Sequence, residues 1–149
     1  MKEKHLLLLQ SELALMDKAT EHLRFSYKRC QTVGNKENYT PDELEHFESL
    51  TGRFARLSDL IIQKIFRLID QLDLDKQGTI RDQINRAEKK GLIASAETFI
   101  EIRELRNNIA HEYDPTATLN LFKAVMLLCP AIFNAIENIH QYSEKYSIK

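Results

Sequence analysis

Apolar residues recur at steps of three and four along the N-terminal part of the chain. This spacing places about one side chain per turn on the same side of a helix. The positions that follow it are Leu6, Leu9, Leu13, Met16, Leu23, Tyr27 and Cys30. The stripe is broken only at Thr20 and predicts a helix from about residue 3 to residue 31. Gly34, Asn35 and Asn38 then predict a loop.

A second long helix is predicted by its start signal and by its apolar spacing. Thr40 can cap the N-terminus, Pro41 suits the first helical position, and Glu43 lies three residues after the cap. The apolar positions are Phe47, Leu50, Phe54, Leu57, Ile61, Ile65, Leu68 and Leu72. Gly52 weakens this helix slightly without interrupting the pattern. A turn is predicted over residues 73–78.

A short third helix and a longer fourth helix follow. Thr79 with Asp82 can cap the third helix, and Gly91 after two lysines marks its end. Ser95 can cap the fourth helix. The apolar positions of the fourth helix are Phe99, Ile102, Leu105 and Ile109.

The last helix begins where the fourth one stops. Asp114 can act as its N-cap and Pro115 suits its first turn. Its apolar positions are Leu121, Val125, Leu128, Ile132, Ile136 and Ile139. Pro130 lies inside this helix and predicts a kink, because proline lacks the backbone donor and clashes with the preceding turn.

These elements predict an all-α fold. No segment alternates apolar and polar residues as a strand would, and the chain shows no repeat or linker. The chain has 149 residues, of which only 4 are Gly and 3 are Pro, which favours long helices over many hairpins. We expect one domain over residues 1–149, an up-and-down four-helix bundle with an additional short helix.

The composition indicates a soluble protein. The apolar run at Leu6 to Leu9 stops at Gln10, which is too short for a signal peptide or a membrane span. Cys30 and Cys129 have no metal-binding or redox spacing, so both are expected in the core of a cytoplasmic protein.

The formal net charge is −1, so any contact with RNA needs a local basic patch. The chain offers several groups of basic residues. They are Arg24, Lys28 and Arg29, then Arg53 and Arg56, then Arg86, Lys89 and Lys90. A solvated helix face explains these residues as well as RNA binding does.

Most chemical motifs are absent from the sequence, including a phosphate loop, a nucleophile elbow and a metal-binding cluster. The exception is the end of the fourth helix. Arg106 is followed directly by Asn107, His111 comes five residues after the arginine, and Tyr113 comes two residues after the histidine. At about 100° per residue, Arg106 and Tyr113 share a side with apolar neighbours, whereas Asn107 and His111 lie together on another side.

This segment resembles the Arg-x4-His-x-Tyr motif of the HEPN superfamily, in the form found in HepT-type toxins and in nucleotidyltransferase substrate-binding proteins. The resemblance covers residues 106–113 closely and the helix order loosely. It implies a ribonuclease that cleaves RNA without a metal or other cofactor. It also implies a homodimer whose paired motifs line one cleft, which would bring together side chains that one helix points apart. A long arginine side chain that curls round the helix, or a distorted last turn before Pro115, can also bring them together within one chain.

The resemblance assigns roles residue by residue. Arg106 and His111 are the expected catalytic residues, because arginine can bind a phosphate with two hydrogen bonds and histidine can transfer protons. Asn107 is expected to support them. Tyr113 corresponds to the tyrosine to which a minimal nucleotidyltransferase attaches adenylate, thereby neutralising the toxin of a type II toxin–antitoxin pair.

Other interpretations remain open at the level of sequence. The chain can be a non-catalytic substrate-binding subunit of a nucleotidyltransferase, or a helical interaction module without chemistry. Arg106 can pair with an acidic residue of a neighbouring helix, and His111 and Asn107 can bind carbonyl groups at the helix end. Tyr113 can be a core aromatic residue. The helical wheel places Tyr113 on the inner side of the helix, which makes its hydroxyl difficult to reach unless a dimer cleft exposes it.

Overall fold

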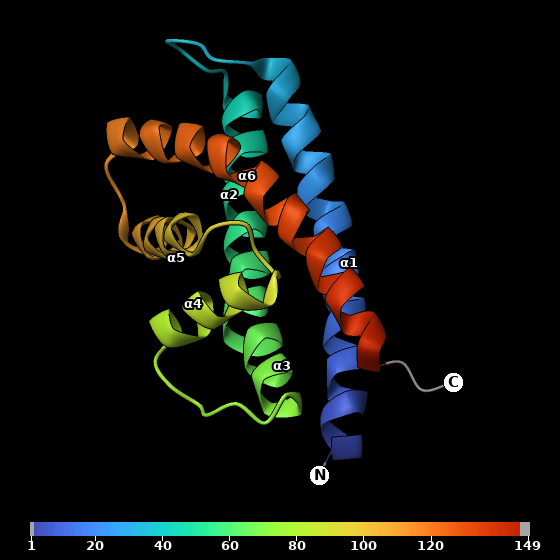
Figure 1. The fold of residues 1–149 in the computed structure, drawn as a ribbon. Coiled ribbons are helices and arrows are strands. Elements are labelled where there is room, and N and C mark those ends of the chain that lie inside the picture. The colour runs from blue at the N-terminus through green and yellow to red at the C-terminus, as the bar shows by residue number, and fades with distance from the viewer. Residues whose placement is uncertain (1, 147–149) are drawn as a thin grey trace.

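The computed structural model describes residues 2–146 as a series of helices joined by short loops (Figure 1). The elements are α1 (Lys2–Val33), α2 (Pro41–Asp59), the π-helix η1 (Leu60–Ile65), α3 (Phe66–Leu72), α4 (Ile80–Lys90), α5 (Ala96–His111), α6 (Pro115–Ser143) and the 3₁₀ helix η2 (Glu144–Tyr146). The described residues contain no strand, and the predicted all-α class is confirmed.

The predicted N-caps of α2 and α4 form complete capping boxes. The Thr40 side chain accepts a hydrogen bond from the Glu43 backbone N–H, and the Glu43 carboxylate accepts one from the Thr40 N–H. Thr79 and Asp82 repeat this exchange at the start of α4. Each box satisfies two backbone donors that a helix N-terminus leaves unpaired.

The remaining predicted boundaries also have a local cause. Ser95 caps α5 by accepting a hydrogen bond from the Thr98 N–H, and Asp114 caps α6 by accepting one from the Thr116 N–H. Gly91 ends α4 with a φ of 81°, a left-handed conformation that costs glycine little.

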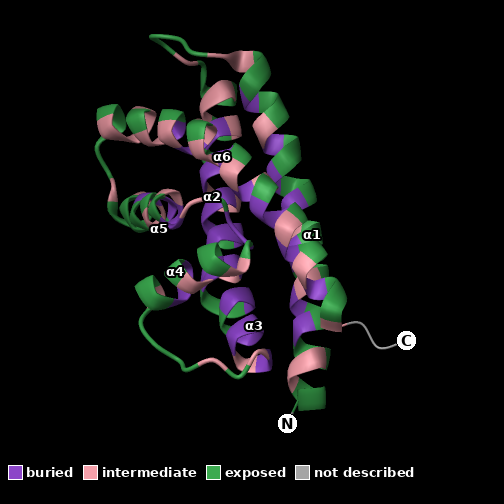
Figure 2. Cartoon of the chain, viewed as in Figure 1, coloured by how far each residue is buried: buried purple, intermediate pink, exposed green. Residues whose placement is uncertain are grey.

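The core lies around the central column made of α2, η1 and α3. Figure 2 shows buried residues along this column and on the sides of the neighbouring helices that face it. The largest fully buried side chains come from α1, the central column, α4 and α5; they are Leu9, Met16, Leu23, Leu50, Phe54, Leu57, Ile61, Ile65, Phe66, Ile69, Ile84 and Phe99. Cys30 and Cys129 are buried and free, as predicted. Burial raises the pKa of the Cys30 thiol to about 11.

The central column departs from the continuous α-helix that the apolar spacing predicts. Its turn at Leu60–Ile65 is a π-helix, in which the Phe66 N–H bonds to the Ile61 carbonyl. A π turn holds an additional residue. Ile61, Ile62 and Ile65 of this turn are buried in the core. The π-helix starts directly after Asp59.

The last helix, α6, is bent near its middle and crosses α2 before it runs along α1 (Figure 1). The proline predicted to cause this bend, Pro130, lies within the helix.

By length and composition, Pro115–Tyr146 is apolar enough to cross a membrane. Core helices of soluble proteins meet the same criterion. In the view of Figure 1, α5 is seen almost end-on and α1 from the side. The up-and-down four-helix packing stays a prediction.

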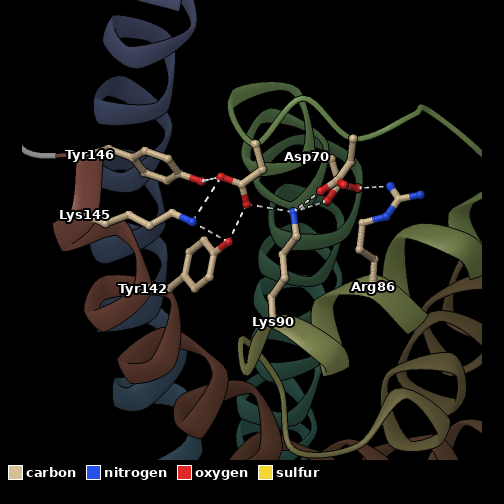
Figure 3. A network of polar contacts seen from close by, with 8 residues as sticks. Asp70, Arg86, Lys90, Tyr142, Lys145 and Tyr146 are labelled. Atoms are coloured by element: carbon tan, nitrogen blue, oxygen red, sulfur yellow. Dashed lines mark hydrogen bonds and ion pairs between the residues drawn. The ribbon is translucent and has the colours of Figure 1, made fainter.

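A polar network ties the C-terminal end of α6 to the end of α3 (Figure 3). The Asp73 carboxylate accepts hydrogen bonds from the hydroxyls of Tyr142 and Tyr146. It also forms ion pairs with Lys90 at 2.9 Å and with Lys145 at 3.2 Å. One carboxylate therefore connects the end of α3 with α4 and with the C-terminal helices α6 and η2, which lie about 70 residues later in the sequence.

The same network fixes α4 against α3. The Lys90 ammonium contacts Asp70 at 2.9 Å and Asp75 at 2.7 Å in addition to Asp73. Arg86 reaches the buried Asp70 carboxylate at 2.8 Å. Because Asp70 is buried, its charge requires these two cationic partners.

Candidate functional site

Arg106 lies on α5 and is paired with a carboxylate of α2. Its Nε donates hydrogen bonds to both oxygens of Asp59, at 2.8 and 3.0 Å. The pairing answers the difficulty seen in the sequence, where Arg106 shares a helix side with apolar residues. The hydrogen bond to Asp59, together with the charge of that carboxylate, raises the pKa of Arg106 above its usual value. Burial acts in the opposite direction, and its effect is smaller than that of the hydrogen bond.

The Arg106–Asp59 pair is not sealed in the interior. The side chains of Arg106 and Asp59 are 30% and 33% exposed. Within residues 2–146, the hydrogen bonds of the guanidinium all run from Nε, so both Nη groups keep their donors. This arrangement fixes one edge of the guanidinium and leaves the opposite edge for an anion.

Asn107 and His111 lie one turn apart on the exposed side of α5. α5 remains an α-helix up to His111, so these residues keep the separation from Arg106 that the helical wheel predicts. No hydrogen bond joins Arg106 to His111 in the described part of the chain. One chain therefore presents the guanidinium and the imidazole on different sides of one helix.

Tyr113 is not on the inner side of the helix, and that expectation was wrong. α5 ends at His111, and the Tyr113 side chain is 88% exposed in the connection to α6. The turn is formed by Glu112, whose carboxylate accepts hydrogen bonds from the backbone N–H groups of Tyr113 and Asp114 at 3.1 and 2.9 Å. Continuing the wheel past the helix end placed the ring incorrectly.

A cavity of about 430 Å³ lies beside the Tyr113 ring. The other residues that line it come from the loop after α1, from α2 and from the start of α6; they are Glu37, Asn38, Tyr39, Leu44, Glu48, Pro115, Thr118, Leu119 and Phe122. Its volume is within the usual range for a small-molecule site. Tyr113 thus combines an accessible hydroxyl-bearing ring with an adjacent hollow.

Two residues of this region were missed by sequence reasoning. Asp59 is 47 positions before Arg106, and only the packing of α2 against α5 brings them together. Glu112 was given no role, and no sequence pattern indicates that its carboxylate accepts hydrogen bonds from the Tyr113 and Asp114 backbone N–H groups. Among residues 2–146, no group of three or more His, Cys, Asp or Glu side chains can hold a metal ion.

Comparison of the chain with models of known protein families gave no matching family. Comparison with curated proteins gave no similar sequence. The functional interpretation therefore depends on the eight-residue segment and on the geometry around Arg106, His111 and Tyr113.

Proposed function

We propose that the chain is a metal-independent ribonuclease of the HEPN type and acts as a homodimer. The proposal includes the four-helix bundle of that family, with α4 as the additional short helix. The observation that carries it is the state of Arg106, whose guanidinium is held at one edge by Asp59 and open at the other. An exposed histidine follows five residues later on the same helix.

The proposed reaction is a transfer within the RNA strand. His111 takes the proton from a ribose 2′-hydroxyl, and the 2′ oxygen attacks the neighbouring phosphorus. The bond from phosphorus to the 5′ oxygen breaks, and the His111 imidazolium formed in the first step gives its proton to that leaving oxygen. The Arg106 Nη groups bind the phosphate and stabilise the charge that develops on it. Asn107, one turn before His111, orients the imidazole.

A homodimer supplies the geometry that one protomer lacks. Arg106 and His111 face different sides of α5, so one straight helix does not direct both at the same phosphate. In a symmetric pair, Arg106 of one protomer can lie opposite the His111 of the other. Each of the two shared sites then contains one arginine and one histidine, which acts first as the base and then as the acid.

The proposed biological setting is the cytoplasm of a cell that also makes a minimal nucleotidyltransferase. The chain is the toxin of a type II pair, and the partner neutralises it by transferring adenylate to Tyr113. The exposure of Tyr113 supports this role, because a transferase can reach its hydroxyl without unfolding the chain. An adenylate on Tyr113 would lie next to His111 and compete with the RNA.

A second candidate function is a non-catalytic subunit that presents substrate to a nucleotidyltransferase. The ion pair of Arg106 with Asp59 is equally consistent with it, because a purely structural pair has the same appearance. The absence of a hydrogen bond between Arg106 and His111 in residues 2–146 is also consistent with it.

A nuclease assay on the purified chain separates the two functions. We expect the wild type to cleave RNA in the presence of a metal chelator, and Arg106→Ala or His111→Ala to lower the rate by about 100-fold or more. Arg103→Ala, on the same helix, and His5→Gln are matched controls that should cleave normally. Cleavage that survives His111→Ala contradicts the proposal, and intact RNA with the wild type favours the binding subunit.

A further inference from the structure

Two stripes of basic, hydroxyl and aromatic residues meet along the line where α1 and α2 pack. On α1 the stripe follows helical spacing and consists of His22, Phe25, Ser26 and Arg29. On α2 it consists of His46, Ser49, Arg53 and Arg56. Neither stripe contains an aspartate or a glutamate. Two helices thus bring together three arginines and two histidines, a local cluster that the net charge of −1 does not reveal. Glu45 and Glu48 of α2 border this cluster on one side.

A small hollow of about 80 Å³ lies between the stripes. It is lined by Phe25, Ser26, Arg29, His46, Ser49 and Arg53, and no carboxylate lines it. A hollow of this size has room for a few water molecules, so it suits a group the size of a tetrahedral oxyanion rather than a whole nucleotide. Guanidinium, imidazole and hydroxyl groups are the donors that bind phosphate.

The hollow is organised before any ligand enters. Arg53 Nη1 donates hydrogen bonds to the Ser26 hydroxyl at 2.7 Å and to the His22 carbonyl at 3.2 Å. Within residues 2–146, neither Arg53 nor Arg29 forms an ion pair. Glu45 and Glu48 line an adjacent hollow with Arg53, yet they do not pair with it in this part of the chain. The remaining guanidinium donors are therefore available to an anion.

Phe25 gives the hollow a second kind of surface. Its side chain is 57% exposed, and the Arg29 guanidinium carbon lies 5.5 Å from the ring centre. An exposed aromatic ring beside a cation is a stacking platform for a nucleobase. An isolated phosphate ion has no group that can stack on such a ring, whereas a nucleic-acid strand carries bases beside its phosphates.

We propose that this hollow binds a backbone phosphate of single-stranded RNA, with Phe25 stacking on a neighbouring base. The identity of the nucleic acid rests on the proposed ribonuclease function. The binding itself uses no residue of the Arg106–Tyr113 segment. The site would hold the strand while the paired motifs cleave it.

Binding can be measured without cleavage by using the full chain with His111→Ala and a fluorescently labelled single-stranded RNA. In about 50 mM salt, Arg29→Gln combined with Arg53→Gln is expected to weaken binding at least tenfold. It should also flatten the logarithmic salt dependence by roughly 1 to 1.5, the value for two lost phosphate contacts. Phe25→Ala should weaken binding about fivefold and leave the salt slope unchanged. Arg67→Gln on α3 is the matched control and should bind normally.

Arg53 also joins α1 to α2, so the double variant can lose stability. Arg29→Gln alone removes no hydrogen bond within the described residues and should still weaken binding severalfold. Inorganic phosphate should shift the amide resonances of Ser26 and Ser49 in the unmodified chain. Unchanged RNA binding in the double variant, or equal loss with Arg67→Gln, overturns the proposal. Phosphate binding without RNA binding overturns the assignment to RNA. Failure of the ribonuclease function appears instead as binding without cleavage.

Discussion

The pairing of Asp59 with Arg106 contributes more to the orientation of the guanidinium than to the stability of the fold. Both side chains are about one-third exposed, and a solvent-exposed ion pair contributes only about 0–1 kcal/mol to folding. By contrast, a guanidinium held at Nε loses little freedom when its Nη groups bind a phosphate. Asp59 is therefore a positioning residue in the proposed reaction, since it acts through the arginine.

Replacing Asp59 should separate these two effects. We expect Asp59→Ala to lower the rate of RNA cleavage about 10- to 100-fold, because the guanidinium is no longer oriented. The melting temperature should change little. Asp59→Glu should restore much of the rate, and Glu101→Gln on α5 is a control. A loss of activity that follows a loss of stability, without rescue by glutamate, would indicate a structural pair only.

The sequence predicted that Arg106 needs an acidic side chain as its ion-pair partner, but it did not predict which one. An arginine between apolar positions of a helix requires a counter-charge, and that follows from α5 alone. The choice of Asp59 among the acidic residues depends on how α2 packs against α5, which no local pattern contains. The exposure of Tyr113 was missed because the helix ends two residues before it.

Among the elements, boundaries with a local cause were predicted well. Thr40, Thr79, Ser95 and Asp114 cap their helices as expected, because each cap is a bond to a residue two or three positions ahead. The π turn at Leu60–Ile65 was not predicted. The apolar spacing through this segment fits a continuous α-helix as well, so no sequence pattern indicates the additional residue.

The carboxylate of Asp73 links α3, α4 and α6 and should make stability depend on pH. Burial alone would raise its pKa, but hydrogen bonds from Tyr142, Tyr146, Lys90 and Lys145 outweigh burial and hold the pKa well below its usual value. The pKa is thus lower in the folded chain than in the unfolded chain. The ionised group stabilises the fold above the ordinary pKa of about 4, and this contribution is lost as the pH falls below it.

Asp73→Asn tests this link between elements. We expect the free energy of unfolding at pH 7 to fall by about 2 kcal/mol, because charge-assisted hydrogen bonds are lost in a largely buried position. Urea denaturation at pH 7 and at about pH 3 should show the difference from wild type shrinking at the lower pH. Asp17→Asn, at an exposed ion pair, should have a small effect. A pH-independent difference would rule out the assigned role of Asp73.

For the whole molecule, the spacing of apolar residues predicted the number of long helices but not their directions. Each amphipathic helix buries its stripe in any of several packings, so the orientation of α5 and the path of α6 after its bend follow from tertiary contacts. One consequence concerns function. With Arg106 directed toward α2 and His111 exposed on another side of α5, the proposed cleft needs a second protomer.

The most direct measurement mixes two inactive variants and follows RNA cleavage in the presence of a chelator. A protomer with Arg106→Ala keeps its histidine, and a protomer with His111→Ala keeps its arginine. Half of the randomly formed dimers are then mixed, and each mixed dimer contains one complete pair of Arg106 and His111. We predict that the mixture recovers about a quarter of the wild-type rate, by this counting of shared sites. A mixture as inactive as its separate components, although mixed dimers form, would contradict a site shared between protomers.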